Sequence, residues 1–203
     1  MEKLEREFYR RDSVLVAREL LGKVLVHEIG GQKVSARIVE AEAYRGVEDK
    51  AAHSYAGRRT PRVEVLYGDP GFAYVFLVYG IHRCFNVVTG EKEVPQAVLI
   101  RAAEPVDGVE WMAQKRFGIS SGQLTKVQRK NLTNGPGKLC EALSINLTAN
   151  GLDLCGNEIY VEECEGQEFA VVSAKRVGID YAEEARDYPW RFYIEGNSCV
   201  SVK

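Results

Sequence analysis

The sequence predicts a mixed α+β domain, and three features of the chain indicate this fold. Its 203 residues fall within the size of one domain. Because no repeat or low-complexity run marks a linker, we expect a single domain over residues 1–203. Apolar residues make up 45% and charged residues 28%, which excludes a disordered chain. Runs of β-branched and aromatic residues outnumber helical segments and do not alternate with them as in a βαβ array.

The first elements follow from capping and turn signals. Asp12 or Ser13 can cap a helix that extends through Leu21 and stops at Gly22. Two β-rich runs, 23–29 and 32–44, then flank a pair of glycines, and this pattern predicts a β-hairpin.

The middle of the chain combines a long polar segment with strands. Residues 46–71 are rich in turn formers, and a loop of this length is more often functional than incidental. Residues 72–80 form an aromatic and β-branched run that predicts a strand, and strand-like sequence continues to Val88. A further strand is expected over 94–105.

The last third alternates helical and extended patterns. Asp107 can cap a short helix through Phe117, and a basic loop is expected over 118–133. Pro136 suits the first turn of a helix through Ile145. Three short runs then predict a strand meander: 158–163, 170–178 and 191–196.

The charges are segregated along the chain although the net charge is only −2. Residues 111–140 hold six basic residues and no acid, whereas residues 141–174 hold seven acids and no lysine or arginine. Phosphate binding needs local basic surface rather than a basic total, because charges are screened within about 8–10 Å. The basic stretch is a candidate nucleic-acid contact; the alternative is a solvated face.

Several classes of protein are not expected. No run approaches the roughly 20 apolar residues of a membrane span. The charged N-terminus resembles no targeting segment, so we expect a cytoplasmic protein. The five cysteines form no C-x-x-C pair and the chain has three histidines, so we expect reduced thiols and no metal site.

The most informative strand carries two glutamates. Side chains alternate along a strand, so Glu40, Glu42 and Tyr44 share one face, with neighbouring positions about 6.5–7 Å apart. Paired carboxylates can supply the acid and base for hydrolysis of a glycosidic bond. The alternative is a solvent-facing sheet surface.

Two further segments suit nucleic acid. The segment 53–62 combines a histidine, three arginines and a threonine in a turn-rich loop, a composition that can hold a phosphate. If Phe76 and its alternate neighbours face one way along their strand, Tyr79 lies on the opposite face, beside Gly80 at the strand end. An exposed aromatic there can act as a wedge or stacking surface. A solvated loop and a core tyrosine are the corresponding alternatives.

Several long motifs appear in a fixed order along most of the chain. They are LLGKVLV (20–26), IVEAEAYRGVEDKAAHSYAGRRTPR (38–62), GDPGFAYVFLVYGIHRCFNVVT (68–89), LIRAAEP (99–105), NGPGKLCEALSIN (134–146) and RFYIEG (191–196). In this order and spacing the chain resembles the alkyladenine (3-methyladenine) DNA glycosylases of mammals and many bacteria. The resemblance implies a curved, mainly antiparallel sheet flanked by helices, with a protruding β-hairpin.

The resemblance also implies roles for individual residues. Glu42 would activate water with the help of Arg101, and Tyr79 would enter the DNA helix where a damaged nucleotide has been turned out. The residues implied for the base pocket are Tyr44, His53, Phe76 and Asn86, and those implied for the DNA backbone are Arg58, Thr60, Arg62, His82 and Lys138. One position departs from the family pattern. The family commonly has tyrosine where this chain has Phe76, so a hydroxyl that bears on base selectivity is absent.

The expected reaction is hydrolysis of the N-glycosidic bond of an alkylated purine such as 3-methyladenine or 7-methylguanine. Deaminated and etheno purines are further candidates. The expected partner is double-stranded DNA that contains the damaged purine, bound by a monomer without a cofactor. No lysine in the matched pocket motifs suggests a Schiff base, so we expect an abasic site and an intact backbone.

Two other functions remain open at this stage. A glycosidase or nucleoside hydrolase could use Glu40 and Glu42 on a small free substrate. A damaged-DNA-binding protein on the same scaffold could bind without catalysis. Release of base from DNA, from free nucleosides, or from neither distinguishes the three.

Overall fold

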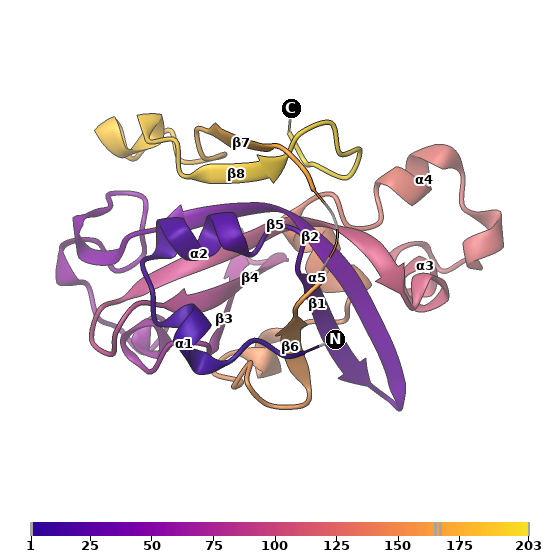
Figure 1. The fold of residues 1–203 in the computed structure, drawn as a ribbon, viewed down its shortest axis with the longest axis horizontal. Coiled ribbons are helices and arrows are strands. Elements are labelled where there is room, and N and C mark those ends of the chain that lie inside the picture. Colours follow the sequence, from indigo (N-terminus) through magenta and orange to yellow (C-terminus); the bar gives the residue numbers. More distant parts are fainter. Residues whose placement is uncertain (1, 165, 167, 203) are drawn as a thin grey trace.

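Eight strands form one antiparallel sheet in the computed structural model, which describes residues 2–164, 166 and 168–202 (Figure 1). The strands are β1 (Val24–Ile29), β2 (Gln32–Tyr44), β3 (Ala73–Val78), β4 (His82–Thr89), β5 (Gln96–Asp107), β6 (Ile159–Glu162), β7 (Val171–Ala174) and β8 (Arg191–Ile194). Their order is β3-β4-β5-β2-β1-β6, and β8 joins β2 to β7. The predicted α+β fold with a mainly antiparallel sheet is confirmed.

The long strand β2 holds the sheet together. One of its edges pairs with β5 along most of its length. Its other edge is shared, because its first half pairs with β1 and Glu40–Glu42 pair with β8. The register against β5 shifts around Glu40, and such irregularities bend a strand. The two glutamates therefore lie where the sheet divides.

The start of the first predicted helix and the hairpin are confirmed, whereas the helix ends at Glu19 rather than at Leu21. Helix α2 (Ser13–Glu19) is capped by Asp12, whose carboxylate accepts a 2.9 Å hydrogen bond from the Val14 N–H. Strands β1 and β2 form the expected hairpin, with Ile29 opposite Gln32. Both glycines of its turn have positive φ, which a type I′ turn requires.

Five α-helices lie among the described residues. They are α1 (Arg6–Tyr9), α2, α3 (Val109–Phe117), α4 (Lys126–Lys130) and α5 (Pro136–Ala142). Helix α2 packs on β2 and β5, whereas α5 packs on β4, β5 and α3. In Figure 1, α2 lies in front of the sheet and α3 and α4 lie at one end of the molecule. The long polar loop contains three single turns of 3-10 helix: Gly46–Glu48, Tyr55–Gly57 and Glu64–Tyr67.

Two boundaries around β5 differ from the prediction. The strand begins at Gln96 and continues to Asp107, two residues later at each end than expected. Asp107 does not cap a helix, because its carboxylate accepts a 2.9 Å hydrogen bond from the Ser35 hydroxyl on β2. Gly108, with φ of 75°, makes the turn into α3 instead. Cross-strand pairing thus overrides the capping preference of the aspartate.

The prediction of a basic loop over 118–133 is wrong. The segment contains the 3-10 turn Ser121–Gln123 and helix α4. Thr125 and Gln128 form a capping box at the start of α4, a T-x-x-Q signal that was present in the sequence. Helix α5 ends at Ala142 rather than Ile145, because Ser144 adopts a positive φ of 55°.

The three C-terminal strands do not form a meander. Strand β6 pairs with β1, while β7 pairs with β8, which joins the same edge of β2 farther along that strand (Figure 1). The expected strand over 170–178 ends at Ala174, so the following residues leave the sheet. This departure brings residue 177 to the catalytic candidates described below.

A hydrophobic core fills the space between the sheet and the helices. Its largest fully buried side chains include Tyr9, Phe85, Leu20, Leu25 and Ile100. All five cysteines are free thiols. None of the helices in the described part of the chain has the length and apolar character that a membrane crossing requires.

Candidate active site

A cavity of about 540 Å³ lies beside four adjacent strands of the sheet and the loops that flank them. Its volume lies within the roughly 300–1,000 Å³ of small-molecule pockets. Its walls come from β2 to β5 and from the segments 51–54, 135–138 and 177–181. Eight residues singled out in the sequence line it: Tyr44, His53, Phe76, Tyr79, His82, Asn86, Arg101 and Lys138.

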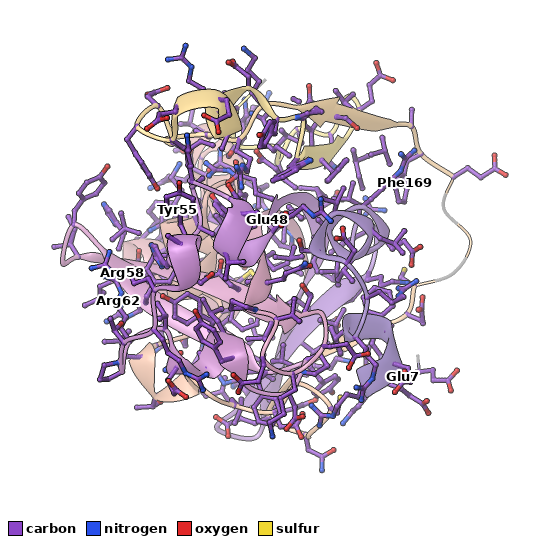
Figure 2. The ribbon with its side chains drawn as sticks, turned by 90° about the vertical axis from the view of Figure 1, so that its left-hand side faces the viewer. Glu7, Glu48, Tyr55, Arg58, Arg62 and Phe169 are labelled. Carbon is purple, nitrogen blue, oxygen red and sulfur yellow. The ribbon has the colours of Figure 1, made fainter. Side chains whose placement is uncertain are left out.

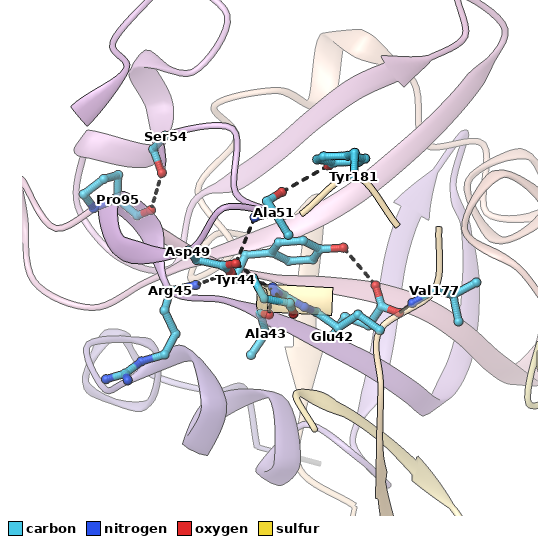
Figure 3. Close-up of polar contacts among 12 residues, drawn as sticks. Glu42, Ala43, Tyr44, Arg45, Asp49, Ala51, Ser54, Pro95, Val177 and Tyr181 are labelled. Carbon is cyan, nitrogen blue, oxygen red and sulfur yellow. Dashed lines mark hydrogen bonds and ion pairs between the residues drawn. The ribbon is translucent and has the colours of Figure 1, made fainter. Parts of the chain in front are cut away.

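Glu42 lies one layer behind the cavity wall. Its carboxylate is fully buried, and it contacts the cavity through Tyr44 and Arg101. The Tyr44 hydroxyl donates a 2.9 Å hydrogen bond to Oε2, and the Val177 N–H donates a 2.8 Å hydrogen bond to Oε1 (Figure 3). Arg101 Nη1 lies 3.5 Å from Oε1. Tyr44, Arg101 and Val177 all line the cavity, so both oxygens of Glu42 lie behind residues of its wall.

Burial raises the pKa of Glu42 above its usual range, because a buried carboxylate loses its hydration. The positive charge of Arg101 and the hydrogen bonds from Val177 and Tyr44 oppose this rise. The negative charge of Glu40 adds to it. The carboxyl group is therefore a stronger base than an exposed glutamate, which suits proton transfer near neutral pH.

Glu40 has different partners although it lies on the same strand. One of its oxygens accepts a 2.6 Å hydrogen bond from the Ser201 N–H, and the other lies 3.2 Å from Arg191 Nε and 3.4 Å from Arg101 Nε. It is fully buried and does not line the cavity. The solvent-facing alternative is wrong for both glutamates. Glu40 ties the C-terminal segment to the sheet, whereas Glu42 adjoins the cavity.

An aromatic cluster forms one wall of the cavity. The ring centroids of Tyr74 and Phe76 on β3 lie 5.1 Å apart. The His53 ring stands edge-on to Phe76 at 4.5 Å, and a hydrogen bond of 2.8 Å joins His53 Nδ1 to the Tyr74 hydroxyl. Asn86 on β4 donates a 3.0 Å hydrogen bond to the Tyr74 carbonyl, which fixes its side chain beside this wall.

His53 is neutral at physiological pH. Burial, followed by the nearby positive charges of Arg62 and Arg58, lowers its pKa to about 4. A neutral imidazole does not repel a cationic base. The wall can therefore attract positive charge through the faces of its rings.

The β3–β4 hairpin ends in a strongly exposed tyrosine. Val78 pairs with His82, and Tyr79 and Gly80 have φ of 52° and 73° in the turn between them. Tyr79 is 90% exposed. It therefore belongs to the turn rather than to the opposite face of the strand, which was the sequence expectation. A positive φ is uncommon for a tyrosine and places its ring at the tip of the hairpin.

Unpaired basic residues lie beside the cavity mouth. Arg58 and Arg62 are exposed and close together at the surface (Figure 2). Neither forms an ion pair within the part of the chain that the structure describes. Arg62 lies with its guanidinium carbon 5.2 Å from the Phe76 centroid. The intervening Arg59 pairs with two glutamates, and Thr60 is half-buried.

Lys138, at the start of α5, lines the cavity as well, although the sequence suggested no lysine in the pocket motifs and assigned Lys138 to the DNA backbone. Its ammonium group donates 2.9 Å hydrogen bonds to the side-chain oxygens of Asn131 and Asn134. Burial and the charge of Arg116 lower its pKa.

Several residues of this site were not found from the sequence. Val177 holds Glu42 through its backbone, so its side chain gives no signal. Tyr181, 68% exposed, stands at the cavity rim and its hydroxyl lies 3.4 Å from the Ala51 carbonyl (Figure 3). Arg176 forms a buried ion pair with Asp49, 127 positions earlier in the chain. Only the fold brings these segments together.

Comparison with known proteins agrees with this geometry. The model of the methylpurine-DNA glycosylase family matches residues 7–198. The chain belongs to this family. It is therefore a DNA-repair glycosylase, an enzyme that hydrolyses the N-glycosyl bond between a base and its sugar in DNA.

Relatives of this glycosylase match over almost all of their length. A protein of Desulfitobacterium hafniense (strain Y51) is 70% identical over 203 residues, which is all of both chains. A protein of Clostridium acetobutylicum is 60% identical over 98% of each chain. One from Bacillus cytotoxicus is 52% identical over 96% of this chain and 97% of its own. All three carry the name 3-methyladenine DNA glycosylase, assigned by inference.

Proposed function

We propose that this glycosylase removes alkylated purines, 3-methyladenine and 7-methylguanine first among them, from double-stranded DNA and leaves an abasic site. The observation that carries the proposal is the buried carboxylate of Glu42. It lies directly behind Tyr44 and Arg101, at the edge of a cavity with aromatic walls. Deaminated and etheno purines are further candidate substrates.

The target base has to leave the duplex before it can enter the cavity. Extrusion costs a few kcal/mol, and damage or mispairing lowers that cost. Tyr79 stands at the tip of a hairpin beside the cavity and is 90% exposed, so its ring can fill the gap that the base leaves. We assign it the role of a wedge that slows the return of the base.

The cavity walls suit a positively charged purine. Alkylation at N3 or N7 places positive charge on the base, and the rings of Tyr44 and Phe76 can contribute cation–π attraction of about 0.5–2 kcal/mol. His53 is neutral at physiological pH, so it adds no repulsion. Because Phe76 lacks a hydroxyl, it offers a stacking face but no hydrogen bond to a neutral lesion.

Glu42 then supplies the chemistry. A water molecule beside the Glu42 carboxylate gives up a proton to it as the water oxygen bonds to C1′ of the sugar. The N-glycosyl bond breaks, and the cationic base leaves with the bonding electrons as a neutral molecule. The carboxylate also stabilises positive charge that develops on the sugar, while Arg101 at 3.5 Å keeps it ionised and oriented.

The remaining assigned side chains contact the DNA backbone. Arg58 and Arg62 are exposed, and His82 and Lys138 line the cavity. We assign all four, with Thr60, to phosphate contacts that position the duplex. The enzyme would act as a monomer in the compartment of the chromosome.

Release of free base from methylated duplex DNA tests this function. We expect 3-methyladenine in the supernatant and abasic sites in the strand, which break only after alkali. Breaks without alkali would contradict simple hydrolysis and direct attention to Lys138. Release from free nucleosides but not from DNA would instead favour a nucleoside hydrolase. Binding to methylated DNA without release would leave a damage-recognition protein.

A further inference from the structure

A buried ion pair lies behind the cavity and takes no part in the chemistry above. Arg176 donates from Nη1 to Asp49 Oδ2 at 2.5 Å and from Nη2 to Asp49 Oδ1 at 2.8 Å. Both side chains are fully buried. Burying two charges is costly, and replacing such a pair by apolar residues is often neutral or stabilising. Stability alone therefore does not explain the pair.

The pair links three segments that carry parts of the site. Arg176 also donates to the carbonyl oxygens of Ala43 on β2, at 2.8 Å, and of Ala185, at 3.2 Å. Asp49 accepts hydrogen bonds from the N–H groups of Arg45, at 3.1 Å, and Ala51, at 3.0 Å. The end of β2, the loop that leads to His53 and the segment after β7 are thus held by one bidentate contact.

Two groups of the site adjoin this ion pair: the Tyr44 ring and the Val177 N–H. The guanidinium carbon of Arg176 lies 4.7 Å from the centroid of the Tyr44 ring, and Arg176 itself does not line the cavity. Figure 3 shows Asp49 and Glu42 at opposite ends of the Tyr44 side chain. The residue after Arg176 is Val177, whose N–H holds Oε1 of Glu42 at 2.8 Å.

We propose that Arg176 is a positioning residue for base excision: its contact with Asp49 and Tyr44 fixes the stacking wall, and its place in the chain fixes the Val177 N–H on Glu42. The proposal rests on the assignment of Glu42 as the base that activates water. A displacement of reacting groups by about 1 Å can cost roughly 100-fold in rate. Holding Tyr44 and the Val177 N–H in place should therefore raise the rate of base excision.

The pH profile distinguishes positioning from a purely structural role. The Val177 hydrogen bond lowers the pKa of Glu42, so its loss moves the acidic limb of kcat to higher pH. The other groups that face Glu42 are Glu40, Tyr44, Arg101 and the Cys84 thiol, whose pKa is raised by burial to about 11. All four are unchanged in the variants below.

The test compares two variants. Arg176→Met combined with Asp49→Asn removes both charges, whereas Arg176→Lys keeps both charges and loses the bidentate guanidinium. A control replaces the Lys33–Glu162 pair at the opposite end of β2 by Lys33→Met and Glu162→Gln. Folding is checked by circular dichroism, and 3-methyladenine release from methylated duplex is measured from pH 5 to 9. Binding to a duplex with a stable abasic analogue is measured in parallel.

We expect the first variant to lose about 10–100-fold in kcat, with its acidic limb at higher pH and abasic-DNA affinity little changed. Arg176→Lys should have a kcat between those of the double variant and wild type. The control should keep the wild-type kcat and the wild-type position of the acidic limb. If the first variant unfolds, Arg176→Lys alone decides between the two roles. A folded Arg176 variant with normal kcat and an unmoved limb would overturn the proposal. Turnover by Glu42→Gln would instead show that the assignment of Glu42 is wrong.

Discussion

The substitution Glu42→Gln separates the chemistry of the site from its fold. Glutamine keeps the shape of the side chain, and its oxygen can still accept the hydrogen bond from the Val177 N–H at Oε1. Its NH₂ group then faces the Tyr44 hydroxyl, which can rotate to accept instead of donating. The packing and hydrogen bonds are therefore retained, and only the basic oxygen and the negative charge are removed.

The effects on rate and on stability have opposite signs. Loss of a general base costs about 100- to 10,000-fold, equivalent to roughly 3–5 kcal/mol in the barrier. The folded state raises the pKa of Glu42, so it binds this proton more tightly than the unfolded chain does. The ionised form therefore opposes folding, and stability falls as the pH rises from the unfolded pKa to the raised folded pKa. Above that window Glu42→Gln removes the penalty and should be at least as stable as wild type.

Single-turnover release of 3-methyladenine and thermal unfolding at pH 5 and pH 8 measure both effects. We expect almost no release, unchanged affinity for methylated duplex and an unfolding temperature at or above that of wild type at pH 8. Release within tenfold of wild type would refute the assignment and make Glu40 the next candidate. A large loss of stability would show that the carboxylate is needed to hold Arg101 and not only to activate water.

Two further predictions concern binding and titration. Tyr79→Ser should weaken affinity for damaged duplex, measured by fluorescence anisotropy, because the 90% exposed ring at the hairpin tip is lost while the Glu42 contacts are untouched; unchanged affinity would exclude the wedge role. NMR titration should place the pKa of His53 near 4, and replacing Arg58 and Arg62 by glutamine should raise it, because their charges repel the imidazolium. Since the unfolded chain protonates this histidine at higher pH, His53 makes stability fall as the pH drops from about 6.5 towards 4, and a measured pKa above 6 would contradict the burial argument.

The elements that the sequence predicted well depend on local physical chemistry. The Asp12 cap and the two-glycine turn are preferences of a few neighbouring residues, and the fold retains them. The alternation that put Glu42 and Tyr44 on one face is a property of any strand, and their side chains meet at 2.9 Å. Asp107 shows the limit of this reasoning, because a partner on another strand, Ser35, decides its side-chain position.

The candidate site was predictable where its residues belong to long motifs. The family resemblance named eight of the residues that line the cavity, although periodicity alone would have left the two glutamates equivalent. What separates them is their neighbours. Glu40 meets Ser201 from the C-terminal segment, whereas Glu42 meets the Val177 N–H from the segment after β7. Neither neighbour is close in sequence, and the second acts through its backbone.

The sequence by itself determined the fold class, the main strands and the identity of the family, because these depend on local preferences and on long ordered motifs. The tertiary structure alone decided that Glu42 adjoins the cavity and that Lys138 borders it. It alone also joined Arg176 to Asp49. The physical reason is that burial and charge pairing depend on segments more than 100 residues apart in the chain, which no local pattern encodes.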